Sequence, residues 1–182
     1  VLPSLICPSD EIAQNPITDS TGGWVYALGS YGGNGGSKSW SSSRPPQGLT
    51  ADGVFHSTGP GSEPKPDQRP VAPEDIRDGV ARTLLFGERS HLDLNYESFT
   101  RAGWGEKLEQ WGRWGASTTR TMIGHVTMSA LAPINYQVPF DIAHRAGQNP
   151  PADTAKAFEH YEDLRLCAYG SGHPRGANFC FV

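Results

Sequence analysis

Short apolar runs, separated by glycine- and proline-rich segments, dominate the hydrophobic pattern of this chain and predict strands more often than helices. Residues 22–31, GGWVYALGSY, are aromatic and β-branched and predict a strand. Residues 82–88 contain the continuous apolar run Thr-Leu-Leu-Phe between turn residues, which is typical of a buried, central strand. Shorter strands are predicted at residues 53–55 and 176–182, and residues 121–136 also favour β-structure.

Helix is predicted most clearly for residues 152–166, ADTAKAFEHYEDLRL, whose apolar positions approximate one helical face. A short helical turn capped by Ser9 or Asp10 is predicted near the start of the chain. Asp78 and Gly79 predict a tight turn that leads into the buried strand. The pattern thus favours short strands over long helices.

The composition fits one domain, residues 1–182, with long irregular connections. Of the 182 residues, 22 are glycine and 15 are proline, so turns and loops are expected to be frequent. The clearest loops are residues 32–48 and 57–73. Five Trp, six Tyr and seven Phe residues supply the large core side chains that a disordered chain lacks. Residues 101–160 are expected to form an insertion within the domain.

The charge pattern argues against a nucleic-acid partner. The net charge is −4, from 15 basic and 19 acidic residues that are interspersed without a polybasic run. Phosphate binding needs a concentrated positive surface, which this pattern does not provide. No apolar stretch approaches the roughly 20 residues that cross a bilayer. The sequence opens at Val1 without an initiator Met, so we expect either a processed product or part of a longer one.

The three cysteines, Cys7, Cys167 and Cys180, permit at most one internal disulfide. Their spacing matches neither a zinc motif nor a redox motif. If the protein is exported, a Cys7–Cys167 or Cys167–Cys180 disulfide is expected, and the alternative is three buried free thiols.

The sequence contains partial matches to two catalytic motifs, and each match lacks a required residue. The segment GGNGGSKS resembles a phosphate-binding loop, but Ser37 stands where the glycine before Lys38 belongs. The segment AYGSG lacks the first glycine of a serine-hydrolase elbow. The six histidines share no short metal-ligand spacing. We therefore assign no catalytic residue, no cofactor and no metal. An alternative function is a metal-assisted hydrolase, in which histidines and carboxylates from distant loops would converge on a metal ion.

A calcium site is a second alternative, suggested by DLNYE. Asp93, Asn95 and Glu97 follow the i, i+2, i+4 spacing that opens a calcium loop. Ser98 replaces the glycine of an EF-hand and Trp104 replaces its final glutamate, which leaves only an irregular calcium site.

The densest aromatic segment is GWGEKLEQWGRWG, with Trp104, Trp111 and Trp114. Exposed indole rings in this segment would stack on sugars, which predicts an extracellular carbohydrate-binding module. The favoured interpretation is that the three rings cover the core beneath a long loop.

Four short sequence fragments occur in this chain in a fixed order. The order identifies a family more specifically than any single fragment does. They are LICPSD, then SYGGNGG with GVF after it, then IRDGVARTLLFGERS, and finally SGHPRGANFCFV. Together they resemble a large family of bacterial proteins of unknown function, abundant in planctomycetes, with prepilin-type N-termini and a C-terminal His-Pro-Gly-Gly-x-Asn motif. The chain departs from the family pattern at residues 80–82, which replace Thr-Ser-Asn, and at Arg175, which replaces a glycine. The sequence also lacks the family's hydrophobic helix before Val1 and its Asp-Gly-Ser-Val end after Val182, so the resemblance implies a trimmed chain.

The resemblance implies a pilin-like α+β fold, in which an antiparallel sheet packs on a helix among long Gly/Pro-rich loops. It also implies an exported, cell-surface structural or assembly protein, a pilin- or pseudopilin-like subunit and not an enzyme. Its partners would be copies of itself or companion subunits. An N-terminal hydrophobic helix preceding Val1 would anchor it in the inner membrane and polymerise.

The family motifs have a mainly structural interpretation. We expect Glu88, His173 and Asn178 to form a polar cluster that joins the two central strands. The full set of expected signature residues is Asp78, Gly79, Glu88, Arg89, His173, Gly176 and Asn178.

Overall fold

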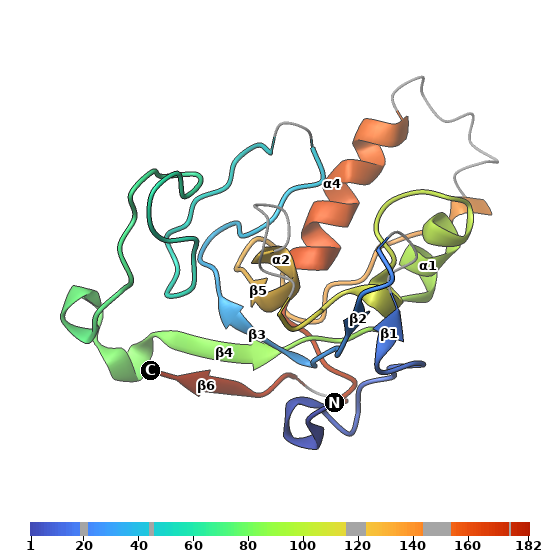
Figure 1. The fold of residues 1–182 in the computed structure, drawn as a ribbon. Coiled ribbons are helices and arrows are strands. Elements are labelled where there is room, and N and C mark those ends of the chain that lie inside the picture. Colours follow the sequence, from blue (N-terminus) through green and yellow to red (C-terminus); the bar gives the residue numbers. More distant parts are fainter. Residues whose placement is uncertain (19–21, 44–45, 116–122, 144–153, 175) are drawn as a thin grey trace.

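The inner strand β4 (Leu84–Glu88) organises a four-stranded sheet, shown in Figure 1 as a computed structural model of the chain. The strand order is β5 (Thr127–Met128), β3 (Tyr31–Asn34), β4, β6 (Phe179–Phe181). β4 runs antiparallel to both of its neighbours, whereas β3 and β5 are parallel. The α+β class is therefore confirmed, with a mixed sheet in place of the purely antiparallel one expected.

The structure describes residues 1–18, 22–43, 46–115, 123–143, 154–174 and 176–182, and, of residues 154–157, only the backbone. No helix in these ranges is long and apolar enough to cross a membrane. The expectation of one domain with an insertion at 101–160 stays a prediction.

Glycines in the sheet allow aromatic rings from elsewhere to lie directly on it. A Cβ atom on Gly33 would lie 2.5 Å from the ring of Phe55. A Cβ atom on Gly87 would lie 2.5 Å from Tyr169 and 2.8 Å from Phe179. Because neighbouring positions of a strand face opposite sides, and Gly33 pairs with the residue before Gly87, the rings cover both faces of the sheet.

The predicted strands at residues 82–88 and 176–182 are confirmed as β4 and β6. The apolar run at 22–31 is divided: β2 (Val25–Tyr26) pairs with β1 (Ile17–Thr18) in a separate two-stranded sheet, and only Tyr31 enters β3. The prediction for residues 53–55 is wrong, because they form bends instead of a strand.

The helix predicted at 152–166 is confirmed as α4 (Thr154–Cys167). Two helices were not predicted, α1 (Leu94–Arg101) and α2 (Ile123–Val126). The second begins inside a segment expected to be β-structure, of which only β5 is a strand. Short 3₁₀ turns complete the fold: η1 (Pro3–Leu5), η2 (Pro73–Asp75), η3 (Val80–Arg82) and η4 (Leu108–Gln110).

The main hydrophobic core lies beside the sheet, where α1 and α4 meet the surrounding loops (Figure 1). At its centre the rings of Phe99 and Phe158 stack with their centroids 4.5 Å apart. The buried members of this core are Trp40, Tyr96, Phe99, Leu108, Trp111, Val138, Phe158, Leu166 and Cys167. Loops thus contribute as much to the core as regular elements do.

Asp93 joins three parts of the molecule through one buried carboxylate. Its Oδ1 accepts a hydrogen bond from the backbone N–H of Tyr96 at 3.0 Å and caps α1. Its Oδ2 accepts from the N–H of Val138 at 2.9 Å and from Nε of Arg165, in α4, at 3.0 Å. Both oxygens are therefore committed to the fold.

This use of Asp93 overturns the calcium interpretation. Asn95 donates through Nδ2 to the carbonyl of Val138 at 2.6 Å, and Glu97 pairs with Arg101 on the same helix at 2.7 Å. Because Asn95 and Glu97 belong to an α-helix, successive positions point in different directions and the oxygens do not converge.

Replacing Asp93 by alanine is expected to lower the free energy of unfolding by about 3–5 kcal/mol, because Arg165 is then left buried without its carboxylate and α1 loses its cap. Urea denaturation followed by tryptophan fluorescence measures the change. Glu97→Ala is the matched control, since its ion pair is exposed at Arg101 and contributes less than about 1 kcal/mol. Equal losses in the two variants would contradict this account of Asp93.

Candidate functional site

Residues from three distant segments meet where β4 ends and β6 begins. They are Cys7 near the N-terminus, Glu88 at the end of β4, and His173 with Asn178 just before β6. Figure 1 shows the N-terminal segment beside the start of β6. We call Cys7, Glu88 and His173, with their partner Asn178, the polar cluster.

Glu88 is fully buried and is held by Asn178. Its Oε2 accepts from the backbone N–H of Asn178 at 2.6 Å, and its Oε1 accepts from the side-chain Nδ2 at 3.0 Å. Burial opposes ionisation, yet these hydrogen bonds hold the pKa of Glu88 below its ordinary value. The structure therefore brings Glu88, His173 and Asn178 together, and a charged carboxylate lies among them.

His173 presents one ring nitrogen to two partners. Its Nε2 lies 3.4 Å from Oε1 of Glu88 and 3.5 Å from Sγ of Cys7. Cys7 is buried, and its sulfur also contacts Oγ of Ser9 at 3.0 Å. The imidazole side chain is 43% exposed and Asn178 is also exposed, so the cluster reaches solvent through these two residues.

A solvent-open hollow lies beside the cluster. It is lined by His173, Pro174, Gly176, Ala177 and Asn178. The loop is held by Oγ of Ser171, which donates to the carbonyl of Gly176 at 2.6 Å and accepts the backbone N–H of His173 at 3.1 Å. Gly176, an expected signature residue, thus lines the hollow and is bonded through its backbone.

The arrangement does not match a thiol–imidazole catalytic relay. In such a relay the nucleophile contacts one ring nitrogen and the orienting carboxylate holds the other. In this cluster Cys7 and Glu88 both approach Nε2 of His173. The donor atoms of the three residues lie within 4.8 Å of one another, and within the described ranges they form the one such group suited to a metal ion.

Two more signature residues, Asp78 and Gly79, lie at the opposite end of β4. Gly79 has a φ of 87°, a conformation that favours glycine, and its N–H bonds to the carbonyl of Ile76 at 3.1 Å. They form the tight turn that was predicted and do not reach the polar cluster.

Arg89, next to Glu88, is fully buried and bonds to backbone carbonyls. Its guanidinium donates to the carbonyl oxygens of Gly124 at 3.0 Å, His125 at 2.6 Å and Thr127 at 2.8 Å. Burial lowers the pKa of Arg89 to about 10. Its role is to hold the end of α2 against the sheet.

The comparisons with known proteins give one match. A sequence profile of the family described as "Protein of unknown function (DUF1559)" matches residues 1–182. The chain belongs to the DUF1559 family. No curated protein and no solved structure matches it. The DUF1559 match supports the resemblance to a family of unknown function, because it covers all four motif fragments.

The Asp10–His91 pair next to the polar cluster was not predicted. Asp10 accepts from the backbone N–H of His91 at 2.8 Å, and its Oδ2 lies 2.7 Å from Nδ1 of the His91 ring. Burial opposes ionisation of Asp10, but its hydrogen bonds with His91 hold its pKa below the ordinary value. Asp10 therefore anchors the N-terminal segment of this DUF1559 chain and does not cap the helical turn that was expected at this point.

The predicted disulfides are not formed, because all three cysteines are free. Cys7 belongs to the polar cluster, whereas Sγ of Cys167 lies in the core, 3.6 Å from the carbonyl oxygen of Trp40. Cys180 is exposed on β6. The free-thiol alternative therefore describes the chain, except that one thiol is exposed.

The three tryptophans do not form a platform for sugars. Trp111 is only 2% exposed and packs edge-on against Trp40, with ring centroids 5.1 Å apart. Trp104 packs against the core at Phe158, and the ring of Trp114 lies against Gly29. The interpretation that the rings cover the core is confirmed for Trp111 and Trp104.

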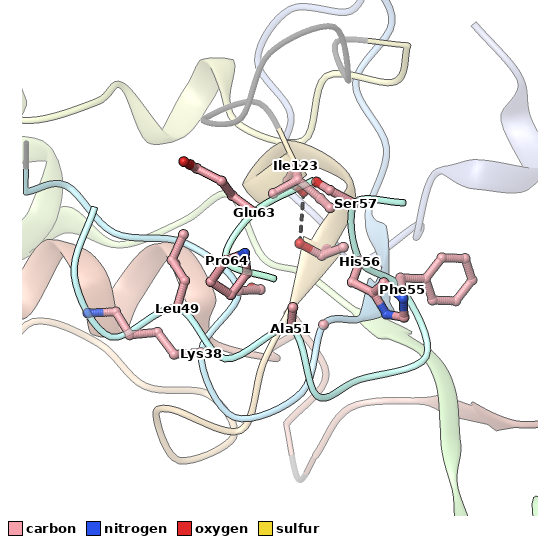
Figure 2. A pocket seen from close by; sticks show the side chains of 12 residues that line it. Lys38, Leu49, Ala51, Phe55, His56, Ser57, Glu63, Pro64 and Ile123 are labelled. Atoms are coloured by element: carbon pink, nitrogen blue, oxygen red, sulfur yellow. Dashed lines mark hydrogen bonds between the residues drawn. The ribbon is translucent and has the colours of Figure 1, made fainter. Parts of the chain in front are cut away.

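A second hollow lies between the long loop that follows β3 and two residues of other elements, Ile123 of α2 and Thr127 of β5 (Figure 2). Its polar groups are already partnered: Lys38 pairs with Asp163 at 2.5 Å, and both ring nitrogens of His56 contact backbone carbonyls. The wall also includes Leu49, Phe55, Pro64 and Ile123. This hollow therefore has a largely apolar lining and brings no set of free acid and base groups together.

A third hollow, beside α4, contains the buried Glu162. Burial raises the pKa of this carboxyl to about 7, although the N–H of Glu106 donates to it at 2.7 Å. Because the folded state holds this proton more tightly than the unfolded state, Glu162 costs stability as the pH rises from 4.5 through 7.

Thiol accessibility gives a direct test of the cysteine assignment. In the native protein one thiol, Cys180, is expected to react rapidly with a thiol reagent, since Cys7 and Cys167 are buried. In guanidinium without reductant, three thiols are expected to react. Recovery of a single thiol in guanidinium would mean that a disulfide had formed.

Replacing Glu162 by glutamine is expected to remove a pH-dependent loss of stability. The free energy of unfolding of the unmodified protein should fall, relative to that of E162Q, by about 3 kcal/mol between pH 4.5 and pH 8. Denaturation curves over this range measure the difference. The control is Glu109→Gln, at an exposed glutamate in η4, which should keep the fall. A pH profile for E162Q that runs parallel to that of the unmodified protein would refute the assignment.

Proposed function

We propose that this DUF1559 chain is the globular head of an exported, surface-associated structural subunit of pilin- or pseudopilin-like type. It acts by packing against copies of itself or companion subunits, and the N-terminal hydrophobic helix implied by its sequence resemblance anchors it in the inner membrane before assembly. The family match supports kinship, and the exposed edge of β6 is the observation that carries the assembly role.

Among the residues that the structure describes, β6 has a hydrogen-bonding partner, β4, on one side only. Its Phe181 is 51% exposed, Val182 beyond it is 37% exposed, and Cys180 is also exposed. Val80 of the neighbouring η3 adds a further apolar side chain, 38% exposed. An open strand edge with apolar side chains is a template for pairing with another chain.

The occupant we propose for this edge is β6 of a second copy, paired antiparallel. The strand Phe179–Phe181 carries no charge, so two copies bring no like charges together. A pairing centred on the middle residue places Cys180 opposite its own counterpart. The thiol is therefore a natural reporter of the contact.

The geometry of the polar cluster supports a role other than catalysis. A catalytic relay needs the nucleophile on one ring nitrogen of the histidine and the orienting carboxylate on the other. In this cluster the Cys7 thiol and the Glu88 carboxylate both approach Nε2 of His173.

Mild oxidation of the purified chain at high concentration is expected to give a disulfide-linked dimer that Cys180→Ser does not form. Phe181→Lys should reduce the yield several-fold, because a charge on the edge opposes pairing. Leu94→Lys is the matched control, since Leu94 is also an exposed apolar residue but lies on α1. Equal dimer yields in the two lysine variants, or a monomer at every concentration in sedimentation, would refute the β6 contact.

Export is tested in the source cells with an antibody against the chain. Protease added to intact cells should remove the signal, whereas a cytoplasmic marker should persist. A signal that is protected until the cells are lysed would contradict the surface location.

A further inference from the structure

We propose that Cys7, Glu88 and His173 form a binding site for one zinc ion. The site is separate from the β6 edge and does not depend on the assembly role. It would join the N-terminal segment, the central strand and the C-terminal segment through a single ion.

The three donors have the chemistry that zinc prefers. A thiolate, an imidazole nitrogen and a carboxylate oxygen are its usual protein ligands, whereas calcium and magnesium take oxygen ligands only. Two of the three residues, Cys7 and Glu88, are almost fully buried, so their donor atoms are held in place by the fold.

The distances match tetrahedral zinc coordination. With zinc bonds of about 2.3 Å to sulfur and about 2.1 Å to nitrogen or oxygen, neighbouring ligand atoms lie roughly 3.6 Å apart for sulfur and nitrogen and roughly 3.4 Å apart for nitrogen and oxygen. The observed separations are 3.5 Å from Sγ of Cys7 to Nε2 of His173 and 3.4 Å from Nε2 to Oε1 of Glu88. Only small side-chain shifts are needed.

Hydrogen bonding alone explains the convergence on Nε2 poorly. A protonated Nε2 carries a single N–H, which points along one direction, yet His173 has Cys7 and Glu88 on the same nitrogen. A metal ion between the three residues accepts the Nε2 lone pair and attracts both the thiolate and the carboxylate.

Neighbouring groups orient the ligands. Oε2 of Glu88 is held by the backbone N–H of Asn178 at 2.6 Å, which directs Oε1 toward His173. Oγ of Ser9 lies 3.0 Å from Sγ of Cys7, close enough to donate a hydrogen bond to a thiolate. Such outer contacts fix the geometry and strengthen metal sites. The hollow beside His173 leaves an open side for the ion to enter and for a water to complete the coordination.

The experiment uses the purified chain after treatment with a chelator. Titration with Zn²⁺ in a calorimeter should give one ion per chain, and Co²⁺ should give a thiolate-to-cobalt charge-transfer absorption. With Zn²⁺ at about a hundred times its Kd, the Tm should rise by about 5–10 °C.

Cys7→Ser and His173→Ala should each weaken Zn²⁺ binding by about 100-fold or more, since the loss of outer partners alone costs 10- to 100-fold. The matched controls are Cys180→Ser and His160→Ala, which remove an exposed thiol and an exposed imidazole elsewhere. They should bind like the unmodified chain. Circular dichroism checks that each variant folds, and His173→Ala is the safer of the two because its side chain is partly exposed.

The absence of a charge-transfer band, or affinity that survives both Cys7→Ser and His173→Ala, would overturn the proposal, because the cluster would then be held by hydrogen bonds alone. Equal losses in the two controls would also overturn it by locating the metal elsewhere. The dimer yield through Cys180 is measured independently, so failure of the zinc site and failure of the assembly role are distinguishable.

Discussion

The requirement that every buried charge find a partner governs this structure. Four buried charged or polar side chains follow one another at the end of β4 and beyond it, and each takes its partner from a different part of the chain. Glu88 bonds to the segment before β6, Arg89 to the end of α2, His91 to the N-terminal segment, and Asp93 to α4. Leaving one of these buried charges without its partner would cost several kcal/mol, so the six residues 88–93 determine where four distant segments lie.

This polar framework compensates for the scarcity of regular structure. β3 contributes Gly32 and Gly33 to the sheet, β5 is two residues long, and the core residues Trp40, Trp111 and Val138 come from loops. Buried hydrogen bonds specify positions that short strands alone would leave loosely defined. A domain built in this way keeps a fixed shape while its surface loops are free to differ.

The parts predicted from sequence are those whose signal is local. The continuous apolar run of β4 and the one-sided pattern of α4 correctly gave a central strand and a helix. The motif resemblance led to the Glu88, His173 and Asn178 cluster, since it drew attention to polar residues that periodicity ignores. α1 was missed because Asp93 and Asn95 suggested an ion-binding loop, whereas Asp93 is a helix cap.

The remaining errors concern contacts between distant residues. The odd number of cysteines allowed a disulfide, but Cys7 and Cys167 lie in different environments, one in the polar cluster and one in the core. The apolar run at 22–31 predicted one strand, but β2 pairs with β1 in a separate two-stranded sheet. Pairings of this kind are determined by tertiary packing, which a single sequence does not display.

The aromatic rings that cover the sheet have a consequence for the order in which the chain folds. Tyr169 and Phe179, which lie on Gly87, follow it by 82 and 92 positions, and β6, which pairs with β4, is equally distant in sequence. Contacts between such distant residues close long loops, and the entropy lost in closing them delays these contacts relative to local ones. One face and one edge of β4 are therefore completed late in folding.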